Sequence, residues 1–239
     1  MTSNALKIIA CISMACDHIG FLLFPKLEFL RWIGRLALPI FAYFIAQGCF
    51  HTRSKLRYFL QIGGMAIACQ LFYVGESLLN GGIRSIYLNI LFTFSLSILV
   101  CWAYLGAVNG KKARLPLRIG LFVASLCLAV FCCYDLSRVA GIPVTVDYGL
   151  IGVLLPLTAL IFKNKRINFL CFCAGTVIYC LVKAPLFPYV WYSLLALPLL
   201  ALYNGKRGSA KLKWVFYLFY PAHFALIYGI GILLSSFQA

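Results

Sequence analysis

Long runs of apolar residues, separated by short polar segments, recur along the whole 239-residue chain. A run of about 20 mostly apolar residues is long enough to cross the hydrocarbon core of a bilayer as a helix. Proline or clustered basic residues separate the runs, as at Pro25 and Lys163–Arg166. The pattern predicts an all-α fold, a polytopic transmembrane helical bundle of about nine spans, with residues 1–239 forming a single integral-membrane domain. The predicted spans are residues 4–24, 30–50, 58–79, 86–107, 117–136, 147–162, 167–183, 187–203 and 214–235.

The composition supports a membrane protein. The chain is 64% hydrophobic and only 11% charged, whereas a soluble domain is about 25% charged. Eleven cysteines are scattered through the apolar runs without a Cys-x-x-Cys pair or a Cys/His zinc spacing. We interpret them as small hydrophobic side chains in helices, and we expect no metal.

The basic residues predict the orientation of the chain. The net charge is +16, and 14 of the Lys and Arg residues fall in the connections after predicted spans two, four, six and eight, against five in the other connections. This bias follows the positive-inside rule and places the N-terminus in the cytoplasm. We expect a multi-pass protein of the cell inner membrane, with the bilayer and its anionic lipids as partners. Because the bias explains most of the charge, we do not expect binding to nucleic acid.

Polar residues inside the predicted spans mark a candidate site. A charge in the middle of a membrane costs about 2.5–3.5 kcal/mol, so such residues are usually paired or functional. Asp17 and His18 lie in the outer half of the first span, and Arg35 lies at a matching depth in the second. We therefore predict an Asp17–Arg35 ion pair, although such a pair could also serve only to join two helices. The same depth is predicted for Asn89, with Thr93 one turn deeper, and for Asp147 and Tyr148.

Two further groups of residues lie nearer the middle and the cytoplasmic side. Tyr220 and His223 are spaced i, i+3, which places them on one helix face beside Pro221. They could line a substrate path or a packing defect at a helix kink. In the second span, Pro39 predicts a kink in the middle of the membrane. The cytoplasmic end of this span carries His51 and Arg53, which could bind the phosphates of a nucleotide-like donor or serve as ordinary interfacial residues.

Several sequence blocks occur together and in order. They are Asp17-His18-Ile-Gly20, Gly34-Arg-Leu-Ala with Pro39-Ile-Phe-Ala42, Asn89 with Thr93, Asp147-Tyr-Gly149, and Phe219-Tyr-Pro-Ala-His223. With these blocks, nearly the whole chain resembles the TraX family. The resemblance implies a membrane-embedded acetyltransferase that uses cytoplasmic acetyl-CoA. A plasmid-borne member acetylates the N-terminus of conjugative pilin, and the family is distantly similar to integral-membrane acyltransferases that modify sugars.

This resemblance leads to a mechanistic hypothesis for the polar cluster. His18 would act as general base on the acceptor, or would carry the acetyl group itself. Asp17 would pair with Arg35, and Arg35 and Asn89 would polarise the thioester carbonyl. The acceptor would be a pilin-like peptide or a glycan. The sequence leaves the identity of the acceptor and the oligomeric state open.

Two other classes of protein remain as alternatives. Secondary transporters also bury ionisable groups at broken helices, but they usually contain two related halves, and we find no internal repeat here. A non-enzymatic assembly factor for surface appendages would have no catalytic use for the polar residues. Substrate flux in liposomes without acetyl-CoA consumption would indicate a transporter. In an assembly factor, mutating the polar cluster should matter no more than mutating lipid-facing leucines.

Overall fold

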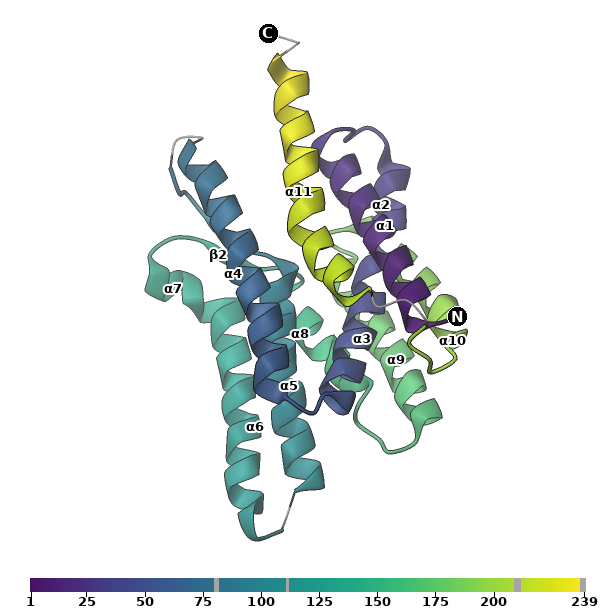
Figure 1. Cartoon of the computed structure of the whole chain (residues 1–239). Coiled ribbons are helices and arrows are strands. Elements are labelled where there is room, and N and C mark those ends of the chain that lie inside the picture. The colour runs from purple at the N-terminus through teal and green to yellow at the C-terminus, as the bar shows by residue number, and fades with distance from the viewer. Residues whose placement is uncertain (80–81, 111, 209–211, 237–239) are drawn as a thin grey trace. The chain divides into compact units, whose positions relative to one another are not determined.

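A computed structural model describes residues 1–79, 82–110, 112–208 and 212–236, and helices dominate it (Figure 1). Lys111 and Lys211, which contribute to the charge bias, lie outside the described residues. The chain divides into two compact units, which we describe separately. Unit 1 combines Met1–Phe41 with Thr176–Ala239, and unit 2 comprises Ala42–Gly175.

Unit 1 is built around the first helix, α1 (Ser3–Leu22), which packs against α2 (Glu28–Gly34) and α11 (Lys213–Ser236). The side chain of Thr2 caps α1 by accepting a hydrogen bond from the Ala5 amide. The unit also contains the first residues of α3 (Ala37–His51), the last residues of α9 (Lys165–Lys183), the 3-10 helix η3 (Pro188–Leu195) and α10 (Ala196–Ala201).

The second predicted span is broken between α2 and α3. Proline cannot donate to the carbonyl four residues earlier, and its ring clashes with that carbonyl. For Pro39 that carbonyl belongs to Arg35, and the helix is interrupted at Arg35 and Leu36. The amides of these two residues instead bond to the carbonyls of Trp32 and Ile33, each at 3.2 Å. The helix is therefore interrupted one turn before Pro39, with Arg35 at the break, and the predicted kink in the middle of the membrane stays a prediction.

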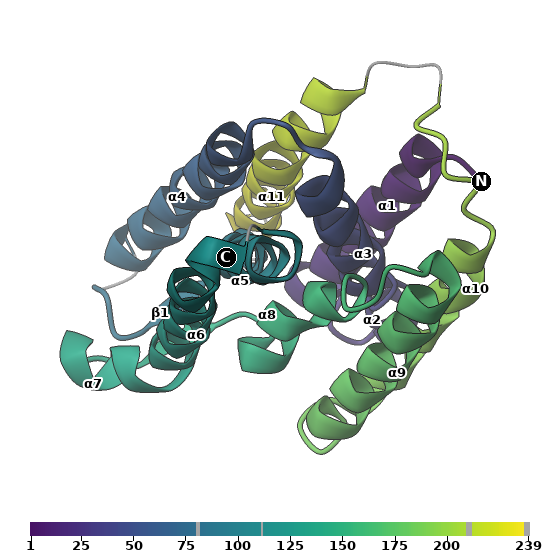
Figure 2. The same cartoon turned by 90° about the horizontal axis from the view of Figure 1, so that it is seen from below.

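Unit 2 contains the longest helix, α4 (Lys55–Leu79), and a group of helices packed around α5 (Ile90–Asn109). Figure 2 shows α6 (Leu115–Val130) and α8 (Gly149–Thr158) beside α5, where Val100, Ala129 and Val153 form a buried core. The remaining elements are η1 (Lys112–Arg114), the π-helix η2 (Phe131–Asp135), α7 (Leu136–Ala140), β1 (Ile86–Leu88) and β2 (Val144–Val146).

The two short strands correct the prediction that a helix spans residues 86–107. β1 and β2 pair in parallel, with Ile86 opposite Val144 and Leu88 opposite Val146. The helix begins only at Ile90 because the Asn89 side chain accepts a hydrogen bond from the Leu91 amide and caps it. The fold is thus mostly helical, with one two-stranded sheet among the described residues.

The protein is a multi-pass membrane protein. Six helices in the described part of the chain are long and apolar enough to cross a bilayer. Large apolar side chains on them, such as Phe21 (63% exposed), are directed outward, as lipid contact requires. The other three predicted spans coincide with shorter apolar helices, so nine crossings stay a prediction, as do the cytoplasmic N-terminus and the single domain. The six are Ser3–Leu22, Glu28–His51, Lys55–Gly75, Ile90–Asn109, Lys112–Ala140 and Lys165–Lys183.

Candidate functional site

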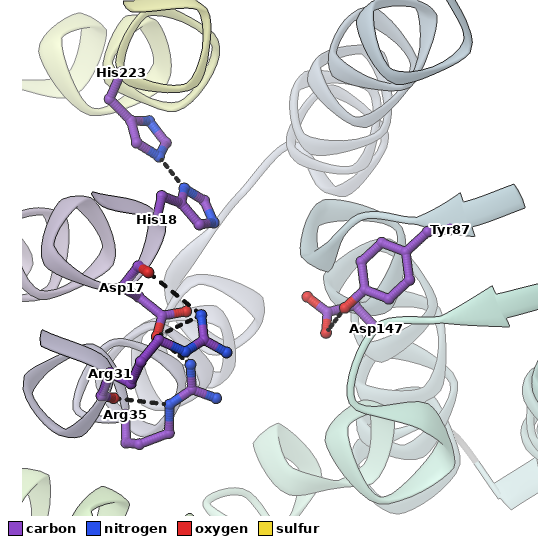
Figure 3. Close-up of polar contacts among 7 residues, drawn as sticks. All are labelled: Asp17, His18, Arg31, Arg35, Tyr87, Asp147 and His223. Atoms are coloured by element: carbon purple, nitrogen blue, oxygen red, sulfur yellow. Dashed lines mark hydrogen bonds and ion pairs between the residues drawn. The ribbon is translucent and has the colours of Figure 1, made fainter. Parts of the chain in front are cut away.

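Asp17 on α1 is held by two arginines of the α2 segment (Figure 3). Arg31 Nη1 lies 3.1 Å from Asp17 Oδ1 and also donates to the Asp17 backbone carbonyl at 3.3 Å. Arg35 Nη2 pairs with the same carboxylate oxygen, while its Nε donates to the Arg31 carbonyl at 3.2 Å. The side chains of Asp17 and Arg35 are only 14% and 10% exposed, so solvent screens the pair little. The predicted Asp17–Arg35 pair is confirmed, and Arg31 makes it a cluster of net charge +1.

Two glycines allow α1 and α2 to approach closely enough for these ion pairs. A Cβ atom at Gly34 would lie 2.6 Å from Asp17 Cγ, closer than real Cβ contacts. A Cβ atom at Gly20 would lie 2.8 Å from the Cβ of Leu30. Small residues serve this purpose in membrane helix pairs, because they let the backbones come together. Gly34 next to Arg35 is therefore part of how the ion cluster is built.

His18 on α1 and His223 on α11 meet edge to edge (Figure 3). Their rings are parallel within 6°, and His18 Nδ1 lies 2.8 Å from His223 Nε2. Face-to-face stacking would hold all ring atoms at about 3.5 Å or more, so this contact is a hydrogen bond. Aromatic rings fix both imidazoles. Phe219 stacks on His223 at 4.6 Å, Tyr220 contacts it at 5.6 Å, and Phe224 meets the edge of His18 at 5.6 Å.

The hydrogen bonds of this pair determine which nitrogen of His18 carries a lone pair. His223 Nδ1 lies 2.8 Å from the Phe219 carbonyl, which can only accept, so Nδ1 carries the proton. In the neutral ring, His223 Nε2 is then an acceptor, and His18 Nδ1 must donate to it. His18 Nε2 is left with its lone pair and bonds to no described residue. A neutral His18–His223 pair thus presents one basic nitrogen, His18 Nε2.

Asn89 in unit 2 is fully engaged in structural hydrogen bonds. Its Oδ1 accepts from the Leu91 amide at 3.0 Å. Its Nδ2 donates to the Ala66 carbonyl at 3.1 Å and to Gln70 Oε1 at 3.3 Å. The residue is 1% exposed. These contacts join α4 to the start of α5, and a role of Asn89 in polarising a thioester stays a prediction.

Asp147 occupies the turn from β2 to α8. Tyr87 Oη donates to its carboxylate (Figure 3), and Thr93 Oγ1 donates to its backbone carbonyl at 2.6 Å. Its own amide donates to the Leu88 carbonyl at 3.0 Å. The next residue, Tyr148, has φ 61°, a left-handed conformation that costs a non-glycine residue about 1–3 kcal/mol. Such strain occurs often at functional sites, so Asp147 and Tyr148 remain candidates for substrate binding.

The structure gathers the predicted residues into two groups. The contacts in unit 1 connect Asp17 to Arg35 and His18 to His223, with Tyr220 beside His223 as its shared face predicted. Asn89, Thr93, Asp147 and Tyr148 belong to unit 2. Convergence of both groups on a single site stays a prediction.

His51 and Arg53 lie elsewhere in unit 2. His51 ends α3 and Arg53 follows in the turn before α4, and both are exposed. Their predicted contact with donor phosphates stays untested. Within the described residues, no group of three or more His, Cys, Asp or Glu side chains is placed to hold a metal ion.

Three contributors were not predicted from the sequence. Arg31 is one of the five basic residues assigned from the sequence to the other connections, although its i, i+4 spacing from Arg35 is a signal for a shared face. Gln70 was visible as a polar residue within an apolar span. The contact of Tyr87 with Asp147 depends on the β1–β2 pairing and has no local sequence signal.

The sequence of the whole chain was compared with known families, proteins and structures. A family model described as TraX protein matches residues 2–231. A protein of Dichelobacter nodosus, named probable fimbrial assembly protein FimC, serogroup H1, is 27% identical over 239 residues, which covers 93% of this chain and 92% of the relative. The uncharacterized protein RP591 of Rickettsia prowazekii (strain Madrid E) is 43% identical over 54 residues, 23% of this chain and 21% of that protein. No solved structure matches the chain.

Proposed function

Because the chain belongs to the TraX family, matched over residues 2–231, we propose that it is a membrane-embedded acetyltransferase. It moves an acetyl group from cytoplasmic acetyl-CoA to an acceptor at or across the cell inner membrane. The acceptor is the N-terminal amine of a pilin-like peptide or the hydroxyl of a surface glycan. The observation that supports this function best is the His18–His223 hydrogen bond, which leaves one imidazole nitrogen available as a base.

The proposed transfer uses His18 Nε2 as the general base. The acceptor N–H or O–H gives its proton to this nitrogen while its N or O attacks the thioester carbonyl carbon. The tetrahedral intermediate collapses by breaking the C–S bond, and the CoA thiolate takes the proton back from His18. His18 Nδ1 keeps its bond to His223 throughout, which holds the ring and shares the positive charge of the imidazolium.

The cluster next to His18 supplies the electrostatic part of the proposal. Asp17 precedes His18 on α1, and its carboxylate is shared by Arg31 and Arg35. The two guanidinium groups carry one positive charge more than Asp17 neutralises. This surplus stabilises the negative charge that develops on the thioester oxygen, and solvent screens the charge of Arg35 less than that of Arg31 because Arg35 is the more buried.

A second candidate function is a non-enzymatic assembly factor for surface appendages. It is favoured by the Dichelobacter nodosus relative, which is named as a probable fimbrial assembly protein and aligns along almost its whole length. The same relative also suits an acetyltransferase whose acceptor is an appendage subunit. The two functions differ in whether His18 is needed for a chemical step.

Label transfer tests the proposal. The purified protein in lipid nanodiscs is incubated with radiolabelled acetyl-CoA and membranes from a strain that lacks the gene, and acceptor-bound label is measured. His18→Asn should lower the rate by about a hundredfold or more. His51→Asn is the comparison variant, at an exposed histidine of the other unit, and loss of its predicted contact with donor phosphates would raise the KM for acetyl-CoA and leave kcat unchanged. A folded His18→Asn protein with the wild-type rate would overturn the proposal. Absence of label transfer by the wild-type protein, with appendages lost in the deletion strain, would favour the assembly factor.

A separate experiment tests whether His223 positions His18 and fixes its tautomer. Side-chain 15N NMR of the wild-type protein should show His18 with Nδ1 protonated and Nε2 bare. His223→Gln retains a side-chain acceptor and should keep more activity than His223→Leu, which has none. The same tautomer and the same rate in His223→Leu would show that His223 does not position His18.

A further inference from the structure

Three basic residues come together where α1 begins. Lys7 lies in the second turn of α1, with Nζ 5.7 Å from the centre of the Phe216 ring on α11. Lys206 and Arg207 belong to the loop between α10 and α11, and both are exposed. The two acidic residues in the sequence of unit 1 are Asp17, which the arginines of α2 bind, and Glu28, at the start of α2. Neither lies near this end of α1.

The loop that carries two of these cations is held rigidly against α1. The Ser3 amide donates to the Lys206 carbonyl at 2.9 Å, and the Asn4 amide donates to the Arg207 carbonyl at 3.1 Å. These bonds satisfy amides at the start of α1 that have no partner within the helix. Gly205 and Gly208, on either side of the two basic residues, adopt φ values of 74° and 98° that favour glycine. The backbone that carries the basic pair is therefore held at the start of α1.

The register of α1 connects this basic end to the candidate base. Lys7 and His18 are 11 residues apart, which is about three helical turns, so they lie on nearly the same face of α1. The rise between them is about 16 Å. An extended chain of four residues reaches about 14 Å. The pantetheine arm of CoA contains a similar number of bonds along its length, so it reaches about as far. The Lys7 side chain can cover the remaining distance.

From these observations we propose that Lys7, Lys206 and Arg207 form a binding site for a phosphate-bearing ligand at the start of α1. Clustered cations with neither acidic residue of unit 1 beside them are suited to phosphate, which Arg and Lys bind with charge-assisted hydrogen bonds. The spacing to His18 identifies the nucleotide phosphates of the acyl donor as the ligand, and this identification rests on the proposed function. Lipid headgroup phosphate is the other source of the same chemistry.

Titration of the full-length protein in nanodiscs with CoA, which cannot transfer an acetyl group, tests the site directly. Lys206→Gln/Arg207→Gln should weaken CoA binding by about tenfold or more, and Lys7→Gln should weaken it further, because each loses a charged hydrogen bond. Binding of pantetheine, which lacks the phosphates, should not change. Lys163→Gln/Lys165→Gln is the matched control, since it removes the same charge from exposed positions of unit 2, just before and at the start of α9.

Further measurements distinguish the phosphates of CoA from those of lipid headgroups. If CoA binding is unchanged but the double variant retains less phosphatidylglycerol from mixed nanodiscs, the site binds lipid phosphate and the donor assignment is wrong. Unchanged binding of both, or loss of CoA affinity in Arg53→Gln instead, would overturn the site. Wild-type protein that binds CoA through these residues yet transfers no acetyl group would refute the proposed function and leave the site standing.

Discussion

Replacing Gly34 with alanine should destabilise the protein even though alanine is the better helix former. The new Cβ would lie 2.6 Å from Asp17 Cγ, and the ion pairs with Arg31 and Arg35 prevent this carboxylate from turning away. Overpacking of this kind costs about 1–3 kcal/mol. The gain in helix propensity is at most about 1 kcal/mol, and less here because Gly34 is the last residue of α2. We expect a net loss of about 1–2 kcal/mol and weaker Asp17 ion pairs.

Gly229→Ala provides a control of opposite sign. Gly229 lies within α11, and no described residue has a heavy atom within 4 Å of a Cβ placed there. The same substitution should therefore stabilise the protein by about 0.5–1 kcal/mol. Unfolding by SDS in mixed micelles, followed by tryptophan fluorescence, measures both variants. If Gly34→Ala is as stable as the wild type, the close approach of α2 to Asp17 is not present in the protein.

Three further predictions use the same unfolding assay. Asp17→Asn should cost about 3 kcal/mol because it removes the carboxylate charge that two shielded guanidinium groups share. Arg35→Gln should cost more than Arg31→Gln because Arg35 is 10% exposed and Arg31 is 22% exposed. Equal costs for the two arginines would contradict this ranking. Asn89→Ala should cost about 2 kcal/mol, since it removes a helix cap and the buried side-chain hydrogen bonds to the Ala66 carbonyl and Gln70. A cost below about 0.5 kcal/mol would mean that Asn89 is not structural.

The predicted depth of a residue in the membrane identified its ion-pair partner correctly where the two residues lie on consecutive helices. Asp17 and Arg35 were paired from their distances to the same membrane surface, and the short connection between α1 and α2 makes their contact almost unavoidable. The sequence-based assignment was wrong for Arg31, which was placed in a connection between spans. Its ion pair with Asp17 places it instead on the same helix face as Arg35, one turn away.

Non-local pairing limited the predictions in unit 2. Asn89 precedes an apolar run, which is a recognisable N-cap signal, and it could have placed the helix start at Ile90. The strand before it could not be recognised in the same way. Ile86–Leu88 forms a strand only because Val144–Val146, more than fifty residues later, supplies its hydrogen-bonding partner. Apolar residues that lead into a helix give no sign of such a partner.

The His18–His223 pair shows most clearly what spacing leaves undetermined. Counting from the predicted span ends put His18 in the outer half of the membrane and His223 near its middle, yet the two rings share a hydrogen bond of 2.8 Å. Such counting assumes that every helix starts at the membrane surface and runs straight across it. Predicted depth also says nothing about which histidine donates in the His18–His223 hydrogen bond. The donor is determined by the Phe219 carbonyl, which can only accept. That carbonyl on α11, and not any group on α1, decides that Nε2 is the basic nitrogen of His18.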